Sequence, residues 1–403
     1  MRLKKYINKN LSQLMLSEFF GRLLLWLRIP VLLVLVPKDL FGLLALIIGT
    51  EVLSSQATAN TSVKLLLSER ISIIQGIQGV LVCSPLILGI AFLLPSFTTA
   101  VITFNQSLVL FGAGIAGSLN HFFLYFLRIN RPSLFAMARV ISSFLIFVGT
   151  VLILPLNWEW IFPLNFFILI IMAYILVRGG EFSGDRDNSE SIRWSRYLYK
   201  IPFFCLNSFY KTFSQNGVRL VVSFILGITH VADFALHSSL AGGVIFGYAV
   251  VLMLVEPRIT KSNSELGKTG KLRLVHLSWI LGFCISVVYL TIIFWFSHTQ
   301  WAINLGVSYH IDIMLFTILV LALLVSFVST ILSGFLLGLG EVSNFVFHPL
   351  ICISGFVASF TLIIDMDSLL DVGSSLLVGE LLGLVFLLYR VCFVRSPNNP
   401  KAL

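Results

Sequence analysis

Apolar residues fall in blocks of about twenty, and this feature constrains the fold of the chain more than any other. At 1.5 Å rise per residue, about twenty helical residues cross a hydrocarbon core of about 30 Å. Only 11% of the 403 residues are charged and 58% are hydrophobic, whereas soluble domains are about 25% charged. Lipid is therefore the solvent for most of the surface. Inside lipid the backbone must satisfy its own hydrogen bonds, which predicts an all-α polytopic membrane protein.

The blocks predict about twelve membrane spans in two six-helix bundles. The bundles comprise residues 1–177 and 202–403, the second with a short cytoplasmic tail, and the polar stretch 178–201 is predicted to be a cytoplasmic linker. The first block is too long and too polar for a signal-peptide core, so we expect it to be retained. The expected spans are residues 14–36, 40–57, 72–95, 106–127, 134–155, 160–177, 202–228, 233–256, 274–297, 313–336, 344–364 and 370–393.

The lysines and arginines between these spans predict the orientation. With both termini in the cytoplasm, most of the 27 basic residues, Lys64 and Arg70 among them, fall in cytoplasmic segments, and the opposite side receives only Lys38. The formal charge of +9 is thereby explained by topology, and no nucleic-acid partner is required. The five cysteines are scattered singly in apolar stretches, so we expect no disulfide framework, metal site or cofactor.

Five cations remain at membrane depth, where an isolated charge costs several kcal/mol. Asn207, Lys211, Gln215 and Arg219 recur at intervals of four, which predicts a polar stripe on one face of a helix. Glu18 and Arg22 are also four residues apart, and Glu51 is expected near mid-bilayer. Arg139 lies about one turn inside its span, so we expect it to reach the cytoplasmic surface. The five cations are Arg22, Arg28, Arg139, Lys211 and Arg219.

Two interpretations of these charges stay open. They form a structural ion-pair network, or they line a pathway for a substrate that carries phosphate or carboxylate groups. The second is favoured because the cations outnumber Glu18 and Glu51, and because arginine suits bidentate phosphate contacts. Gly112, Gly114 and Gly117 are expected to allow close helix packing, and we expect structural roles for Asn120 and His121 beside them.

Two segments at an offset of 193 residues look related. Residues 32–43 and 225–236 each follow a membrane-embedded arginine, Arg28 or Arg219, and end in Phe-Gly-Leu and Phe-Ala-Leu. With the Glu256-Pro257 pair that ends the eighth span and the short outer loops, the chain resembles the polysaccharide flippases of the multidrug/oligosaccharidyl-lipid/polysaccharide (MOP) exporter superfamily. Within it, the chain resembles especially the bacterial O-antigen (Wzx-type) flippases.

This resemblance implies a MATE-like fold in the bacterial inner membrane and a function that is not enzymatic. The expected activity is transfer of an undecaprenyl-diphosphate-linked oligosaccharide from the cytoplasmic to the periplasmic leaflet by alternating access. The resemblance implies a substrate site of Arg22, Arg28, Lys211 and Arg219, extended by Asn207 and Gln215 of the predicted stripe. Glu18 or Glu51 would couple transport to a proton or sodium gradient. Membrane lipids, a polysaccharide polymerase and a chain-length regulator are the expected partners.

Three other functions fit the sequence less well than a flippase. A MATE-like antiporter for small molecules or cations would require carboxylates in its cavity, where cations predominate here. A polysaccharide polymerase or ligase is less well supported, because the outer loops carry only Lys38. A major-facilitator carrier is disfavoured because residues 57–71 lack the Gly-x-x-x-Asp-Arg-x-Gly-Arg pattern expected after the second span.

Overall fold

The computed structural model is helical throughout the residues that it describes. These are 2–69, 72–93, 103–178, 201–260, 267–298, 312–341, 343–362 and 368–393. The contacts group the chain into two compact units, Met1–Leu236 and His237–Leu403. Most of the predicted linker, residues 179–200, lies outside the described residues, and the expected bundles 1–177 and 202–403 remain a prediction.

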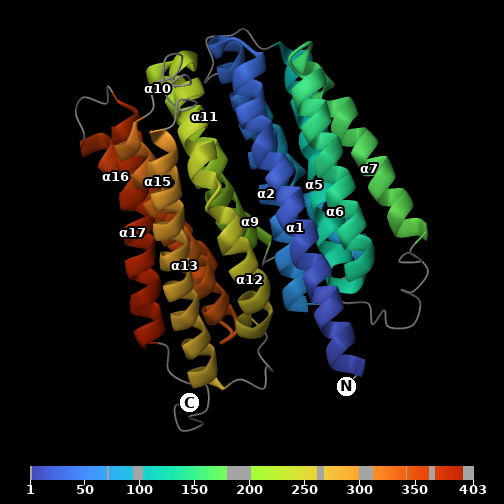
Figure 1. Ribbon diagram of the computed structural model, residues 1–403, viewed down its shortest axis with the longest axis vertical. Helices are drawn as coiled ribbons and strands as arrows, with labels where there is room; N and C mark the ends of the chain where they lie inside the picture. Colours follow the sequence, from blue (N-terminus) through green and yellow to red (C-terminus); the bar gives the residue numbers. More distant parts are fainter. Residues whose placement is uncertain are drawn as a thin grey trace. The chain divides into compact units, whose positions relative to one another are not determined.

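The first unit contains α1 to α10 and most of α11. Figure 1 shows α1, α5, α6 and α7 running along one another, in keeping with their contacts. Short π-helical turns, η2 (Gly149–Ile153) and η4 (Phe213–Gly217), follow α6 and α9, and the 3₁₀ turn η3 (Trp158–Trp160) precedes α7. The helices are α1 (Arg2–Leu35), α2 (Lys38–Glu69), α3 (Ile73–Val82), α4 (Ser84–Leu93), α5 (Phe104–Asn130), α6 (Pro132–Val148), α7 (Ile161–Arg178), α9 (Ile201–Thr212), α10 (Val218–Leu226) and α11 (Ile228–Gly242).

Helix α2 lies at the centre of the first unit. It contacts α3, α4 and α5 as well as α9, η4 and α10. Its buried face is rich in hydroxyl groups that donate to the carbonyl four residues earlier, as Thr50 does to Leu46 and Thr61 to Ala57. Such bonds satisfy the hydroxyls inside their own helix, so the small side chains can be buried without other partners. Neighbouring helices can then approach α2 closely.

Glycines of α5 confirm the expected close packing. A Cβ atom on Gly114 would lie 2.5 Å from Ile87 Cγ2 and 2.8 Å from Ser54 Oγ of α2. Gly112 meets Phe162 of α7 in the same way. Next to them, Asn120 donates a 2.9 Å hydrogen bond to the carbonyl of Asn165, which joins α5 to α7.

Local sequence signals explain where several helices begin and end. Ser72 with Gln75, and Thr103 with Gln106, form reciprocal capping boxes at the starts of α3 and α5. Pro132 opens α6, a position where its missing N–H costs nothing. Gly227 adopts a φ of +88° between α10 and α11, a conformation that side-chain-bearing residues rarely adopt.

The second unit packs the rest of α11 with α12 (Ile245–Thr260), α13 (Lys268–Ser297), α15 (Ile313–Leu337), α16 (Asn344–Leu362) and α17 (Leu369–Phe393). Its core includes Tyr248, Phe327 and Phe335, and the rings of Tyr248 and Phe327 stack with centroids 4.4 Å apart. The opposite face of α13 exposes large apolar side chains such as Ile280, Phe283 and Val288. A face of this kind suits contact with lipid.

Within the described part of the chain, nine helical segments are long and apolar enough to cross a membrane, or ten if the bent pair α11 and α12 is one span. The chain is thus a multi-pass membrane protein. The expected first and seventh spans are also helical, as α1 and as α9–η4–α10, but they are not among the nine. They are the segments that carry Glu18, Arg22, Arg28, Lys211 and Arg219, so their charges lower their apolar character.

Some predicted boundaries are wrong. The second span was expected at 40–57, but α2 continues to Glu69 and carries Lys64 inside the helix instead of in a loop. The span expected at 72–95 is confirmed as one apolar segment, Ile73–Phe92, in which Cys83 separates α3 from α4. The eighth span, expected at 233–256, contains the junction of α11 with α12. Hydropathy correctly located the apolar centres of these helices. Their ends were missed because the helices continue through polar residues or bend within the span.

The close packing of α5 predicts the effect of enlarging a glycine. We expect Gly114→Leu to lower the free energy of unfolding by about 1–3 kcal/mol, the usual cost of overpacking. Gly89→Leu on α4 is the matched control, because a Cβ atom there meets nothing within 4 Å. Thermal unfolding of the two purified variants in detergent measures the difference. Equal melting temperatures would contradict the packing described for α2 and α5.

Candidate functional site

The candidate site consists of buried charged and polar side chains inside the first unit. They come from α1, α2, α6 and the α9–η4–α10 segment. The packing of α1 on α6, and of α2 on α9 and α10, brings these helices together. Because a charge inside a membrane protein requires a partner or water, the contacts of each group indicate what it can do.

Glu18, Arg22 and Arg139 form an ion triad. The Glu18 carboxylate accepts from Arg22 Nε at 2.7 Å, across one turn of α1, and lies 3.0 Å from Arg139 Nε of α6. Glu18 is 7% exposed and Arg139 is 9% exposed. Gly21 allows this approach, since a Cβ atom there would lie 2.9 Å from Arg139 Nε. One carboxylate therefore compensates two guanidinium groups.

The expectation that Arg139 reaches the cytoplasmic surface is wrong. Its side chain is buried against α1 and pairs with Glu18. A position one helical turn inside the span permits either arrangement. The glycine at position 21 of α1, which opens space for the guanidinium group, decides between them.

Arg28, Glu51 and Arg219 form a second group, which we call the Arg28 cluster. Arg28 attracts the Glu51 carboxylate and repels the Arg219 guanidinium, so both of these groups lie within electrostatic range of Arg28. Arg219 is 6% exposed and donates from Nη1 to the carbonyl of Ala45 at 3.2 Å. The buried Arg28 Nε has no hydrogen-bond partner among the described residues. Two buried cations thus lie near each other, and the Glu51 carboxylate faces one of them, Arg28.

Glycines again create the space for the Arg28 cluster. A Cβ atom on Gly49 of α2 would lie 3.4 Å from Arg219 Cδ and 3.2 Å from the carbonyl oxygen of Asn216. Gly117 of α5 packs directly against Glu51 Oε1. Arg28 and Arg219, the arginines that precede the two related segments of the sequence, lie within electrostatic range of each other in the fold.

His121 lies between the triad and the Arg28 cluster. Its imidazole interacts electrostatically with Arg139, Glu18, Arg28 and Arg22. It follows Gly117 by one helical turn on α5. The sequence predicted a structural role for His121, and its position among four charged groups adds it to the candidate site.

Farther along α2, Lys64 meets the start of the seventh expected span. Its ammonium group donates to Asn207 Oδ1 at 2.7 Å and to Ser208 Oγ at 3.0 Å. Asn207 is fully buried, and Lys211 one turn later is half-buried. Lys64 was absent from the predicted site, because the sequence placed this residue in a cytoplasmic loop. The buried hydroxyl residues Thr58 and Thr61 just before it were the available sign that the polar face of α2 continues.

The predicted stripe of Asn207, Lys211, Gln215 and Arg219 is interrupted. The π-helical turn η4 spans Phe213–Gly217, so residues on either side no longer keep the spacing of a straight α-helix. Gln215 is exposed, whereas Asn207 and Arg219 are buried. The prediction that all four residues share one helix face is therefore wrong. Gln215 is exposed, unlike the other three residues.

The described part of the site is rich in guanidinium groups. Glu18 pairs with Arg22 and Arg139, and Glu51 attracts Arg28. Guanidinium groups suit phosphate or carboxylate oxygens. The described residues contain no group of three or more histidine, cysteine or acidic side chains placed to hold a metal ion. Guanidinium donors and carboxylates can bind anions and exchange ions.

No protein-family model matches the chain, and no curated protein sequence matches it either. Solved structures of transporters do resemble it in fold. A point mutant of the Vibrio cholerae MATE transporter VcmN has a TM-score of 0.66 at 15% identity, over 96% of this chain and 97% of that one. The eukaryotic MATE transporter AtDTX14 has a TM-score of 0.65 at 11% identity, over 96% of both chains.

A third similar structure is described as the outward-facing conformation of a multidrug resistance MATE family transporter of the MOP superfamily. Its TM-score is 0.59 at 14% identity, over 94% of both chains. Identities this low speak for the fold alone. The protein therefore has the MATE-like fold found in the MOP superfamily, and the structures that it matches are transporters, not enzymes.

The triad predicts a large effect of removing its carboxylate. We expect Glu18→Ala to destabilise the protein by about 3–5 kcal/mol, because Arg139 would be left as an uncompensated buried charge. Glu341→Ala is the control, since its pair with Arg390 is about one-third exposed on both sides and such pairs contribute about 1 kcal/mol or less. Denaturant unfolding in detergent compares the two variants. A loss for Glu18→Ala no larger than for the control would show that water reaches the triad.

Proposed function

We propose that the protein is a flippase for an anionic lipid-linked glycan. The substrate class is an undecaprenyl-diphosphate-linked oligosaccharide such as an O-antigen repeat unit, carried from the cytoplasmic to the periplasmic leaflet. The supporting observation is the buried guanidinium group of Arg28, whose Nε has no hydrogen-bond partner among the described residues. A diphosphate could supply the missing negative charge there, through bidentate contacts with guanidinium groups.

The proposed path uses the cations in sequence. Lys64 and Lys211, with Asn207, would receive the diphosphate near one end of α2, and Arg28 with Arg219 would hold it deeper in the membrane. These groups lie along one helix, from Lys64 at its end to Gly49 beside Arg219. Alternating access would expose this path to one leaflet at a time. Gln215 is the weakest member of the predicted set, since η4 turns it away from its neighbours.

The proposal includes the orientation and the energy source. Both termini would lie in the cytoplasm of a bacterium, as the distribution of lysine and arginine predicts. Glu51 would couple an ion gradient to transport, because its binding of a proton or sodium ion changes the charge facing Arg28. Glu18 is the second candidate for this role. A polysaccharide polymerase and a chain-length regulator would act on the delivered glycan.

A MATE-like antiporter of small molecules is the second candidate function. The fold favours it, since the similar structures include one described as a MATE multidrug transporter in complex with a small molecule. The buried carboxylates Glu18 and Glu51 would then serve the substrate or a coupling ion. The excess of arginine in the same region argues against a cationic substrate.

Loss of the deep cations should abolish lipid transfer. We expect Arg28→Gln and Arg219→Gln each to reduce transfer of a fluorescent polyprenyl-diphosphate oligosaccharide in proteoliposomes by about tenfold or more, since charge-assisted contacts contribute about 1.5–3 kcal/mol. Arg178→Gln is the control, because Arg178 stacks on Tyr174 at the end of α7, away from the site. Efflux of small cations is measured on the same preparations. Normal lipid transfer in both variants would overturn the proposal, and loss of cation efflux alone would favour the antiporter.

Coupling through Glu51 has its own test. We expect Glu51→Gln to transfer the lipid at a rate that no longer responds to an imposed proton or sodium gradient, because the side chain cannot change its charge. Glu159→Gln serves as the control, since Glu159 accepts a 2.8 Å hydrogen bond from Gln106 outside the charged groups. Rates with and without each gradient are compared. An unchanged response in Glu51→Gln would assign coupling elsewhere, with Glu18→Gln as the next variant to measure.

A further inference from the structure

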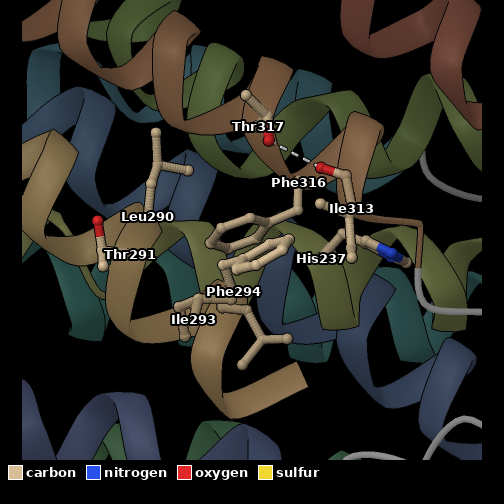
Figure 2. A pocket seen from close by; sticks show the side chains of 9 residues that line it. His237, Leu290, Thr291, Ile293, Phe294, Ile313, Phe316 and Thr317 are labelled. Atoms are coloured by element: carbon tan, nitrogen blue, oxygen red, sulfur yellow. Dashed lines mark hydrogen bonds between the residues drawn. The ribbon is translucent and has the colours of Figure 1, made fainter. Parts of the chain in front are cut away.

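A pocket of about 320 Å³ lies inside the second unit, and none of the charged groups described above lines it. Residues from three helices line it: His237 and Leu240 of α11, Leu290, Thr291, Ile293 and Phe294 of α13, and Ile313, Phe316 and Thr317 of α15. Figure 2 shows the rings of Phe294 and Phe316 directed into the pocket, with His237 at its edge. Its volume falls at the lower end of the range for small-molecule sites.

The polar atoms at the pocket wall already have partners. The Thr317 hydroxyl donates to the carbonyl of Ile313 at 2.8 Å, the contact drawn in Figure 2, and the Thr291 hydroxyl donates to Val287 at 2.9 Å. His237 Nε2 accepts the backbone N–H of Asp312 at 2.8 Å. The hydroxyl groups of both threonines are therefore already bonded within their own helices. A polar ligand would lose its hydrogen bonds to water here and gain few from the pocket wall. The wall therefore favours an apolar occupant.

The surface around the pocket is apolar and lies in membrane-spanning helices. Phe294 is 58% exposed and Ile313 44% exposed, although both line the pocket. Beside them on the same helices, Ile292 and Met314 are also exposed. The helices α13 and α15 both qualify as spans, so hydrocarbon surrounds this surface. An occupant that enters from this side comes from the bilayer.

The position along the helices indicates which part of a lipid fits. Phe294 lies three residues before the end of α13, and Ile313 is the first residue of α15. The pocket is therefore near the end of both spans, about where an acyl chain leaves its headgroup. The side chain of Asp312 caps α15 at this level by accepting from Met314 and Leu315. Polar groups border the pocket on the interfacial side, while the wall itself stays apolar.

We propose that this pocket is a lipid-chain site, which binds one hydrocarbon chain of a bilayer phospholipid. The chain would pack between the rings of Phe294 and Phe316 and the side chains of Leu290 and Ile293. Burial of methylene groups supplies the affinity, at about 0.8 kcal/mol for each group removed from water and less from lipid. The site does not depend on the proposed lipid-linked glycan, since its residues lie in the second unit and carry no cation.

Photo-crosslinking tests the lipid-chain site in the full-length protein. The protein is reconstituted in vesicles of phosphatidylethanolamine and phosphatidylglycerol that contain a phosphatidylethanolamine with a diazirine in its acyl chain. After irradiation, labelled peptides are identified by mass spectrometry. We expect labels to concentrate on residues 290–294 and 313–317, rather than on Val288 and Ile280, which are equally exposed on α13. Uniform labelling along α13 would overturn the proposal without any variant.

Two variants fill the pocket from different walls. Thr317→Phe replaces a side chain whose hydroxyl is bonded only to its own helix, and Ile293→Trp enlarges the wall of α13. We expect labelling of the pocket peptides to fall about tenfold in each, which corresponds to about 1.4 kcal/mol of lost binding free energy. Val288→Phe is the control outside the pocket and should change nothing. Retained labelling in both folded variants, judged by size-exclusion profiles, contradicts the proposal.

A second probe separates the sources of the chain. A diazirine-bearing polyprenyl phosphate is added to the same vesicles in a parallel experiment. We expect the phospholipid probe to label the pocket whether or not the polyprenyl probe is present. Labelling by the polyprenyl probe alone would overturn the assignment to bilayer phospholipid. The transport measurements on Arg28→Gln and Arg219→Gln are unaffected by either result, so the two proposals fail separately.

Discussion

Compensation of charge inside a membrane-spanning unit is the constraint on which the rest of the first unit depends. A guanidinium group at this depth costs several kcal/mol unless a carboxylate, a carbonyl or water faces it. Glu18 satisfies this requirement for Arg22 and Arg139 by joining α1 to α6. The carbonyl of Ala45 contributes to it for Arg219 by joining α2 to α10. The charges therefore hold together helices that hydrophobic burial alone would not align, because lipid is as apolar as their side chains.

Small side chains make this compensation geometrically feasible. Gly21 admits Arg139 and Gly117 admits Glu51, each at a distance that a Cβ atom would prevent, and a Cβ atom on Gly49 would crowd the carbonyl oxygen of Asn216. The hydroxyls of α2 add to the effect, since they bond within the helix and leave a narrow face. Helix packing and charge compensation are thus linked. The glycines allow the helices to approach closely, and this approach places their ionic groups within interaction distance of one another. This linkage explains why α9 and α10 group with the N-terminal half, through α2.

The two units provide contrasting environments. In the first, Glu51 attracts Arg28 and a second buried cation, Arg219, lies within electrostatic range of Arg28, an arrangement suited to an anionic group. In the second, His237, Thr291 and Thr317 have their hydrogen bonds satisfied, which leaves a pocket wall of methyl groups and rings. A lipid-linked diphosphate glycan and a phospholipid chain make opposite chemical demands, and each environment meets one of them. The proposed transport and the proposed lipid-chain site therefore follow from the same physical rule, that a buried surface selects an occupant that completes its bonding.

The sequence by itself determined the fold class, the multi-pass character and the close packing of Gly114 and Gly117, because these depend on hydrophobic block length and on residue size. It also identified Glu18, Arg22, Arg28 and Glu51 as groups at membrane depth. Tertiary structure alone decided their partners: Arg139 turned inward to Glu18, His121 fell among four charges, and Lys64 joined Asn207. Composition also could not reveal η4, which breaks the stripe at Gln215, since a π-helical turn arises from packing. The sequence shows which buried charges require a partner. The partners themselves come from helices that are distant in sequence, so they depend on how those helices pack in the tertiary structure.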